Sequence, residues 1–226
     1  MIVYNIDKNT SEIYLGNVAI SEVYICSEKV FPSEEPPTPV FGEKYKFTLN
    51  DSSIVSAECD SSSAITTAET KNYIYNDKLV TAEIGDCVTS IEASAFQYCY
   101  ALTNLKLSNN LKSIENQLCV YCSSLTSIDI PDSVADIGQS AFEYCSGLTS
   151  VTIGSGVIYV QADAFRNCKS LTSVTFLGVT PPKLMGTYVF YSTNNCPIYV
   201  PQESVNAYKT ASGWSKYADR IQPIQT

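Results

Sequence analysis

Apolar side chains recur at a spacing of 23 residues through the central part of the chain. Each copy reads Leu-x-x-(Leu/Ile/Val)-x-(Leu/Ile/Phe), in which apolar and polar positions alternate as in a short strand with one buried face. The columns in register are Leu102, Leu125, Leu148 and Leu171; Cys99, Cys122, Cys145 and Cys168; and Phe96, Phe142 and Phe165, with Cys119 interrupting the last. Because one copy cannot bury its own apolar face, the copies are expected to stack as coils of a solenoid around a shared core.

The ends of the repeat array differ from its middle, as a solenoid requires in order to close its last apolar faces. The expected organisation is a β module at 1–31, a Pro-rich linker at 32–42, a β cap with a degenerate first turn at 43–78, the solenoid at 79–196 and a strand–helix cap at 197–226. A strand is expected at 44–49. In the last segment Tyr208 and Trp214 have helical spacing and Gly213 breaks the helix; the alternative role of this tail is a binding site centred on Trp214.

The cysteine column could hold a metal ion, supply a nucleophile, form disulfides or pack in the core. Zinc sites need converging Cys-x-x-Cys pairs or His ligands, and the chain has no His and one such pair, Cys119 to Cys122. No cationic neighbour recurs to stabilise a thiolate. A disulfide between neighbouring turns is conceivable, because stacked turns lie ~4.8 Å apart. We expect mostly reduced, buried thiols that fill a fixed corner of each turn.

Composition restricts the possible functions. With 14 Lys and Arg against 23 Asp and Glu, a net charge of −9 and a pI near 4.5, the chain lacks the basic surface that nucleic acids require. The absence of His removes the usual general base and the commonest metal ligand, so we expect no catalysis, cofactor or metal. No segment resembles a signal peptide or a membrane helix, and neither membrane insertion nor an export signal is expected.

The repeats resemble a known family. The copies Ser-Ala-Phe-x-x-Cys-x-x-Leu-Thr-Ser-Val-Thr-Ile, with Ile-Pro-Asp-Ser-Val at 130–134 between them, are similar to BspA-like (treponemal-type) leucine-rich repeats. The similarity is strongest over 79–177 and extends through the tail to residue 226. It implies a mainly β leucine-rich repeat solenoid with a parallel sheet and little helix. It also implies adhesion or protein binding by a surface protein or phage of gut or oral bacteria.

The segment ahead of the repeats is a separate module. Residues 12–31 contain a near-duplication, EIYLGNVAIS and EVYICSEKVF, whose alternation predicts short strands with turns at Gly16-Asn17 and Ser27-Glu28. So few residues do not make a stable sheet alone, and we expect them to pack on identical copies or a larger assembly. With its Pro-rich linker the module resembles the start of phage and prophage structural proteins, although Cys26 stands where those usually have Gly. That implies docking onto other virion proteins through 1–31.

Two sets of exposed side chains are candidate binding surfaces. Tyr98, Tyr121 and Tyr144, with Tyr100 beside them, form a stripe of rings that could stack on sugars, anchor a protein or shield the edge of the core. The polar strand face carries Asn104, Lys106, Ser127, Asp129, Ser150 and Thr152, which are equally compatible with a plain solvated face.

Three functions from different classes follow. The leading hypothesis is a non-catalytic phage accessory or host-recognition protein on the virion surface, which docks through 1–31 and binds a surface protein or glycan through the solenoid, with homo-oligomers left open. The second is a BspA-like adhesin, secreted or on the bacterial cell surface, that binds host protein or glycan. The third, a glycan-processing enzyme, requires two of Asp129, Asp132, Asp136 and Glu143 to converge in a cleft.

Overall fold

The structure is a computed structural model. It describes residues 43–59, 64–73 and 77–225, and the backbone alone of 4–7, 12–15 and 18–20. The chain divides into two compact units, 1–41 and 42–226, which are described separately. The division falls at the end of the expected Pro-rich linker, whose residues lie outside the described ranges.

The first unit contains three short antiparallel strands, β1 (Tyr4–Asp7), β2 (Glu12–Leu15) and β3 (Val18–Ile20), in that order in the sheet. Strands β2 and β3 come from the first half of the near-duplication, where the alternation predicts them. The sequence analysis did not identify β1. The turn at Gly16-Asn17, Cys26 and the second half of the duplication lie outside the described residues.

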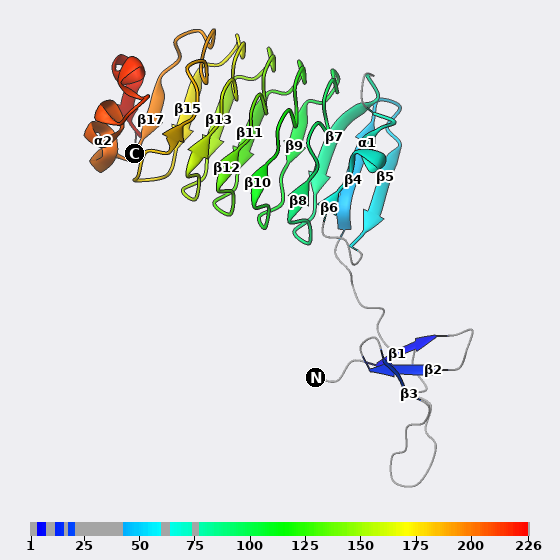
Figure 1. The fold of residues 1–226 in the computed structure, drawn as a ribbon. Helices are drawn as coiled ribbons and strands as arrows, with labels where there is room; N and C mark the ends of the chain where they lie inside the picture. The colour runs from blue at the N-terminus through cyan, green and yellow to red at the C-terminus, as the bar shows by residue number, and fades with distance from the viewer. Residues whose placement is uncertain are drawn as a thin grey trace. The chain divides into compact units, whose positions relative to one another are not determined.

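The second unit is a solenoid whose main sheet has the order β18-β17-β15-β13-β11-β9-β7-β4-β5 (Figure 1). The strands are β4 (Glu43–Leu49), β5 (Ile54–Glu58), β7 (Leu79–Ile84), β9 (Asn104–Lys106), β11 (Ser127–Ile130), β13 (Ser150–Ile153), β15 (Ser173–Phe176), β17 (Ile198–Val200) and β18 (Ile221–Pro223). From β7 to β18 neighbours are parallel, and Ser127 pairs with Ser150 and Ser150 with Ser173, one repeat apart. The predicted leucine-rich repeat solenoid is confirmed.

Shorter strands complete each coil. They are β10 (Ser113–Ile114), β12 (Asp136–Ile137), β14 (Tyr159–Val160) and β16 (Lys183–Leu184), paired in that order, with β6 (Ala64–Ile65) beside β8 (Ser90–Ile91). Each coil therefore has strand on two sides and tight turns between them. None of the helices in the described residues is long and apolar enough to cross a membrane.

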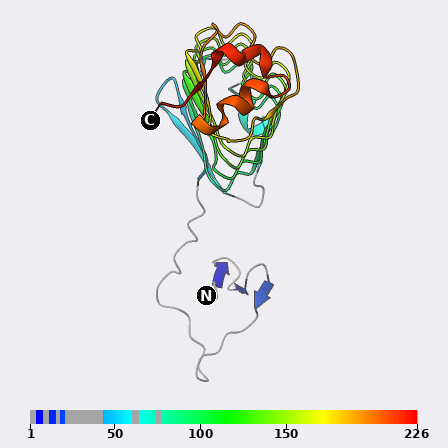
Figure 2. The same cartoon turned by 90° about the vertical axis from the view of Figure 1, so that its left-hand side faces the viewer.

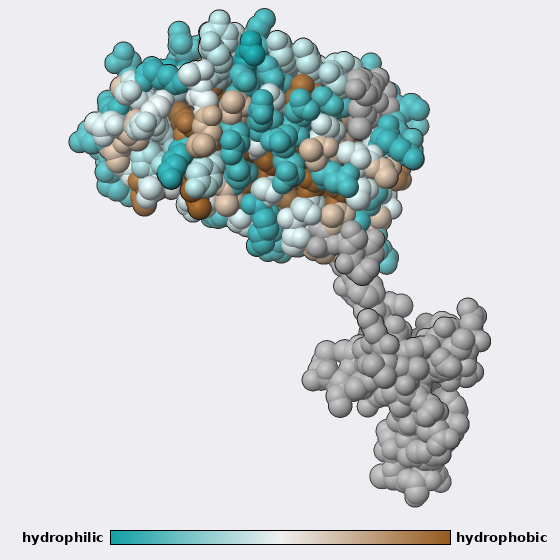
Figure 3. Space-filling view, viewed as in Figure 1, coloured by the Kyte–Doolittle hydropathy of each residue, from teal (hydrophilic) through white to brown (hydrophobic). Residues whose placement is uncertain are grey.

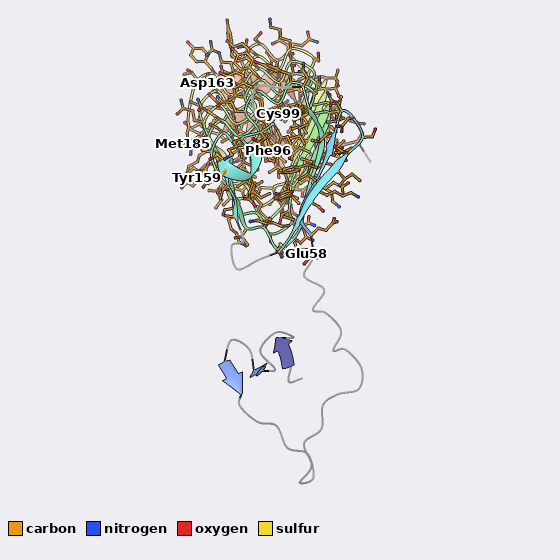
Figure 4. The ribbon with its side chains drawn as sticks, turned by 90° about the vertical axis from the view of Figure 1, so that its right-hand side faces the viewer. Glu58, Phe96, Cys99, Tyr159, Asp163 and Met185 are labelled. Atoms are coloured by element: carbon orange, nitrogen blue, oxygen red, sulfur yellow. A yellow bond between two sulfur atoms is a disulfide. The ribbon has the colours of Figure 1, made fainter. Side chains whose placement is uncertain are left out.

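The recurring apolar columns fill the interior of the solenoid. The Leu, Cys and Phe columns are all fully buried, and Figure 4, which looks along the solenoid, shows Phe96 and Cys99 inside the coil and Tyr159 and Met185 on its outside. Each Cys thiol donates a hydrogen bond to a main-chain carbonyl of the preceding turn, as from Cys122 Sγ to Phe96 O at 3.0 Å and from Cys168 Sγ to Phe142 O at 3.1 Å. The column consists of free thiols, and burial raises the pKa of Cys168.

The interrupted Phe column shows how the core keeps its volume. Residues 118 and 119 are Leu and Cys, where the next turn has Ala141 and Phe142, and all of these side chains are buried. The larger side chain has moved by one position along the chain, so the turn keeps a similar total volume. The sequence predicts that the side chain at Cys119 fills less of the core than the Phe of the other turns. Leu118 compensates for this smaller volume.

The C-terminal end of the solenoid is covered by short helices. These are η1 (Gln202–Ser204), α2 (Val205–Thr210) and η2 (Ser215–Arg220), which lie across the end of the coil in Figure 2. Trp214 is fully buried, and its indole N–H donates to Pro182 O at 2.7 Å, while Tyr208 donates its hydroxyl hydrogen to Gly178 O at 2.8 Å. Gly213 has a positive φ of 80° and separates the two helices, as expected. Trp214 is thus part of the core, which does not fit a binding site centred on it.

The N-terminal end is closed by a hairpin and a short helix. Strand β4 lies where the sequence predicts a strand, and β4 is antiparallel to both β5 and β7. The helix α1 (Thr67–Thr70) begins with a capping box, in which Thr66 N–H donates to the Glu69 carboxylate at 2.8 Å. A disulfide joins Cys59 to Cys87 and ties the end of β5 to the first turn. This pair is an exception to the expected reduced thiols and was not predicted from the sequence.

Candidate binding surface

The strand face of the main sheet is polar and shallow. Asn104, Lys106 and Asp129 are exposed, and Ser127, Ser150 and Thr152 are half-buried. A groove of about 460 Å³ runs over this face, lined by five of these six residues and by Pro131, Asp132 and Leu177. It contains no aromatic side chain, and aromatic residues are the usual anchors of a protein interface.

Three of the four carboxylates considered for glycan hydrolysis have structural partners, and the fourth, Asp129, is exposed on the strand face. Asp132 accepts hydrogen bonds from the Ser155 N–H at 2.6 Å and hydroxyl at 2.9 Å, and Asp136 accepts from Gln161 Nε2 at 3.1 Å. Glu143 pairs with Arg166 at 3.5 Å. These contacts join one turn of the solenoid to the next and explain the acidic residues without chemistry. Within the described residues, no group of three or more His, Cys, Asp or Glu side chains is placed to hold a metal ion.

Tyr98, Tyr121 and Tyr144 form a second surface, called here the tyrosine ladder. Each lies in a tight turn just before a core cysteine, with φ values of 58°, 63° and 60°. The main-chain N–H groups of these residues donate to the next turn, from Tyr98 to Val120 O at 2.8 Å, from Tyr121 to Glu143 O at 2.9 Å and from Tyr144 to Arg166 O at 2.9 Å. The stacking of turns therefore fixes the three side chains in line.

The rings of the ladder stack on one another. The ring centres of Tyr98 and Tyr121 are 5.3 Å apart with an interplanar angle of 13°, and those of Tyr121 and Tyr144 are 4.4 Å apart at 3°. Desolvation and the neighbouring phenol of Tyr144 raise the pKa of Tyr121, so its hydroxyl stays neutral at physiological pH. Because the faces of neighbouring rings cover each other, the ladder presents to solvent mainly ring edges and hydroxyl groups.

The backbone at this position does not favour tyrosine. A positive φ costs an ordinary L-residue roughly 1–2 kcal/mol, and Gly or Asn adopts it more readily. The next two turns have Asn167 and Ser192 in the same conformation, with φ of 61° and 59°. The tight turn is thus compatible with a small polar side chain, and the rings of the ladder are not required to form it. Stacking, at about 0.5–1.5 kcal/mol per pair, offsets part of the backbone strain.

Tyr100 extends the ladder beyond Tyr98, and two further rings form a separate pair beyond the turn that contains Asn167. Tyr100 lies 6.1 Å from Tyr98 between ring centres, and Tyr188 and Tyr191 pack edge to face at 5.4 Å. The guanidinium of Arg166 lies over both of these last rings, at 5.8 and 5.9 Å, and pairs with Asp163 at 3.7 Å. We call the set Tyr98, Tyr100, Tyr121, Tyr144, Tyr188 and Tyr191 the aromatic ridge.

The rings of the ridge differ in exposure, and Tyr98 and Tyr144 are half-buried. Tyr188 and Tyr191 are 52% and 54% exposed, and Tyr121 and Tyr100 are 36% and 38% exposed. On the face of the molecule seen in Figure 3, hydrophobic side chains occur in small groups among hydrophilic ones. Sequence reasoning missed Tyr188 and Tyr191, because the insertion before them breaks the 23-residue spacing. The cluster Tyr-Val-Phe-Tyr at 188–191 was the available signal.

The repeats identify the family. A family model described as a BspA type leucine-rich repeat region matches residues 66–207 in 6 copies. The chain therefore belongs to the BspA-type leucine-rich repeat family. The match begins after residue 65, so it does not bear on the phage-like resemblance of the N-terminal module.

One solved structure shares the repeat fold, and a second is similar in sequence over part of the chain. A leucine-rich repeat protein of T. pallidum is 23% identical with a TM-score of 0.53, and the match covers 68% of this chain and 88% of that one. A leucine-rich cell surface protein of Faecalibacterium prausnitzii is 29% identical with a TM-score of 0.49, covering 53% of this chain. The present chain spans 31% of the length of that protein. None of the curated proteins matches the chain in sequence.

Proposed function

We propose that this chain is a non-catalytic binding protein that acts outside the bacterial cytoplasm, at the cell surface, and binds its partner through the aromatic ridge. The observation that carries the proposal is the tyrosine ladder, in which stacked turns hold one exposed and two half-buried rings in a strained backbone conformation that a smaller residue adopts in other turns. Tyrosine supplies large amphipathic contact area at low cost in side-chain entropy, and it is enriched at binding hot spots.

The geometry of the rings favours a protein over a glycan as the partner. Sugars bind aromatic residues through the flat ring face, and the inner faces of the ladder are covered by neighbouring rings. Ring edges and phenol hydroxyls instead offer an apolar strip with a row of hydrogen-bonding groups, which suits the mixed surface of a folded protein. Arg166 lies half-buried beside Tyr188 and Tyr191, and its charge is balanced by Glu143 and Asp163, so this part of the strip offers both donors and acceptors.

The disulfide supports a location outside the cytoplasm. Cys59 and Cys87 are joined in the N-terminal cap, and disulfides persist in oxidising compartments such as the periplasm and the cell surface. The free cysteines of residues 77–225 are all buried, which protects them from oxidation and exchange in such a compartment. Membership of a family associated with bacterial surface adhesion agrees with this location.

The test compares ridge variants on arrays of immobilised extracellular proteins and of glycans. Tyr98→Ala, Tyr121→Ala and Tyr144→Ala combined should lower binding at least tenfold on the protein array. The matched control is Tyr159→Ala, in the short strand β14 and outside the aromatic ridge, and it should bind as the unchanged chain does. Circular dichroism establishes that both variants are folded. Full binding by the triple variant would exclude the ridge, and binding confined to glycans would exclude a protein partner.

A second candidate is a phage virion accessory protein that docks on other virion proteins through residues 1–31. It is supported by the N-terminal segment, which forms a compact unit separate from the solenoid and contains its own antiparallel sheet. In this alternative the solenoid and its ridge face a host surface molecule. Tail or capsid genes beside the gene for this chain would support it, and a cluster of surface-secretion genes would contradict it.

A further inference from the structure

The main sheet of the solenoid has two edges that differ in chemistry. One edge strand, β18, contains Pro223, which cannot donate a main-chain hydrogen bond and therefore blocks further pairing. The other edge strand, β5, reads Ile-Val-Ser-Ala-Glu and contains neither Pro nor Lys. Within the described ranges no strand pairs with the outer side of β5. Natural sheets usually protect such an edge, because it is a template for pairing with another chain.

The hydrogen bonds of the hairpin show which groups of β5 face outward. Leu49 N–H donates to Ser53 O at 2.9 Å, on the β5 side, whereas Gly85 N–H donates to Lys44 O at 2.9 Å, on the β7 side. In an antiparallel ladder alternate residues face the same neighbour. Phe47 and Tyr45 therefore face β5, as Leu49 does. Their partners in β5, Val55 and Ala57, direct their main-chain N–H and C=O groups toward β4.

The remaining residues of β5 are therefore the ones available to a partner. The main-chain N–H and C=O groups of Ile54, Ser56 and Glu58 point away from β4, toward the open edge. All three side chains are exposed, and that of Ile54 is 57% exposed. Figure 4 looks at this end of the solenoid, with Glu58 at the end of β5.

We propose that β5 pairs with β5 of a second copy of this chain, antiparallel, about a twofold axis through Ser56. In this register Ser56 lies opposite Ser56 of the second copy, and Ile54 lies opposite Glu58. All the outward N–H and C=O groups of the three residues then find partners, in about six hydrogen bonds. The two sheets become one continuous sheet across the axis, as in an isologous contact.

The side chains are self-complementary in this register. The two Glu58 carboxylates lie at opposite ends of the paired strands, so no like charges are opposed. The small Ser56 side chains meet at the axis, where larger ones would crowd. On the core side of the sheet Val55 lies opposite Ala57, a large side chain against a small one. Another register would oppose the Glu58 residues or leave outward groups unpaired.

The predicted dimer is weak. One pair of five-residue strands buries much less than the roughly 800 Å² per partner of a stable interface, so a Kd on the order of 0.1–1 mM is expected. Copies held on one surface reach comparable effective concentrations, where such a contact becomes populated. The pairing uses no residue of the aromatic ridge, so its failure and that of the proposed function are distinguishable.

Charge reversal at the axis tests the register. Sedimentation equilibrium of the full chain up to about 1 mM should show a monomer–dimer equilibrium. Ser56→Lys and Ser56→Glu each place like charges opposite one another, and each alone should weaken the dimer at least tenfold. An equimolar mixture of the two variants should restore association, because Lys then faces Glu. The matched control is Gln222→Lys, a lysine on the opposite edge strand β18, which should leave the equilibrium unchanged.

Each outcome decides the proposal. A chain that stays monomeric at 1 mM has no β5 pairing. A dimer that persists unchanged in Ser56→Lys, or a mixture of the two variants that fails to associate, also overturns the twofold register, because the association then lies elsewhere. Thermal unfolding of each variant, which should match the unchanged chain, separates loss of pairing from loss of fold.

Discussion

The two ends of the solenoid close the same kind of core by different means. At the C-terminal end, Trp214 and Tyr208 pack over the last Phe side chains, with Trp214 5.0 Å from Phe176 between ring centres. At the N-terminal end, Phe47 of the β4–β5 hairpin packs 5.9 Å from Phe96, and a disulfide fastens the hairpin to the first turn. One end is closed across the solenoid axis by helices, and the other is closed by extending the sheet.

This difference determines what each end can do. Helices that cover the core leave a short last strand, which Pro223 ends. The hairpin instead adds β4 and β5 to the main sheet beside β7. It covers the core and makes β5 the new edge of the sheet. Both ends therefore keep an edge strand, but Pro223 blocks pairing at β18, whereas β5 has no such protection.

The largest effect is expected from Trp214→Ala at the C-terminal end. Trp214 is fully buried among aromatic rings, and removing it should lower the free energy of unfolding by about 3–5 kcal/mol. Urea unfolding measures the loss, and hydrogen exchange should show it concentrated in β17 and β18. The control Tyr188→Ala removes a half-exposed ring and should cost below about 1 kcal/mol. Equal losses in the two variants would mean that Trp214 does not close the core.

A smaller effect is expected at the N-terminal end, from loss of the disulfide. Cys59→Ser with Cys87→Ser opens a loop of 28 residues, which should cost about 2–4 kcal/mol, chiefly through the entropy of the unfolded chain. A reductant should lower the melting temperature of the unchanged chain and leave that of the double variant unaltered, since the other described cysteines are already free. A melting temperature insensitive to reductant would show that the hairpin holds without the bond.

The middle of the molecule was predictable because its repeats have to match each other. Every turn packs on the next, so residues such as Leu125 and Cys145 recur at one spacing, and that spacing gives the fold class without coordinates. The tyrosine ladder follows the same rule, which is why the sequence placed its members in line. The spacing does not indicate that these rings bind a partner, because rings that only shield the core would recur at the same spacing.

The ends were less predictable because they contain only one copy of each feature. The Cys59–Cys87 pair depends on where the β4–β5 hairpin folds back against the first turn. This feature occurs once, so no repeated spacing in the sequence indicates it. Tyr191 was missed for a related reason, since the insertion after Phe176 breaks the 23-residue spacing, and the equivalent residues of the preceding turns, Glu143 and Arg166, are not aromatic. The helix α1 did carry a local signal, the Thr-x-x-Glu of a capping box at Thr66 and Glu69.

The smallest predicted effect concerns acid at the N-terminal end. Desolvation acts to raise the pKa of Glu69, but hydrogen bonds from Thr66 and the Lys44 ammonium, 3.0 Å away, outweigh it, so the pKa lies below its ordinary value. A carboxylate with a lowered pKa stabilises the fold above the unfolded pKa of about 4.3 and loses this contribution as pH falls through its folded pKa.

Glu69→Gln isolates this contribution. Between about pH 5 and pH 3, the unfolding free energy of the unchanged chain should fall more than that of the variant, by less than about 1 kcal/mol because Glu69 is partly exposed. Urea titrations at several pH values measure the difference, with the N-terminal hairpin followed by hydrogen exchange. Parallel pH profiles in the two proteins would mean that the ion pair with Lys44 adds nothing to closure of this end, which would then depend on packing and the disulfide alone.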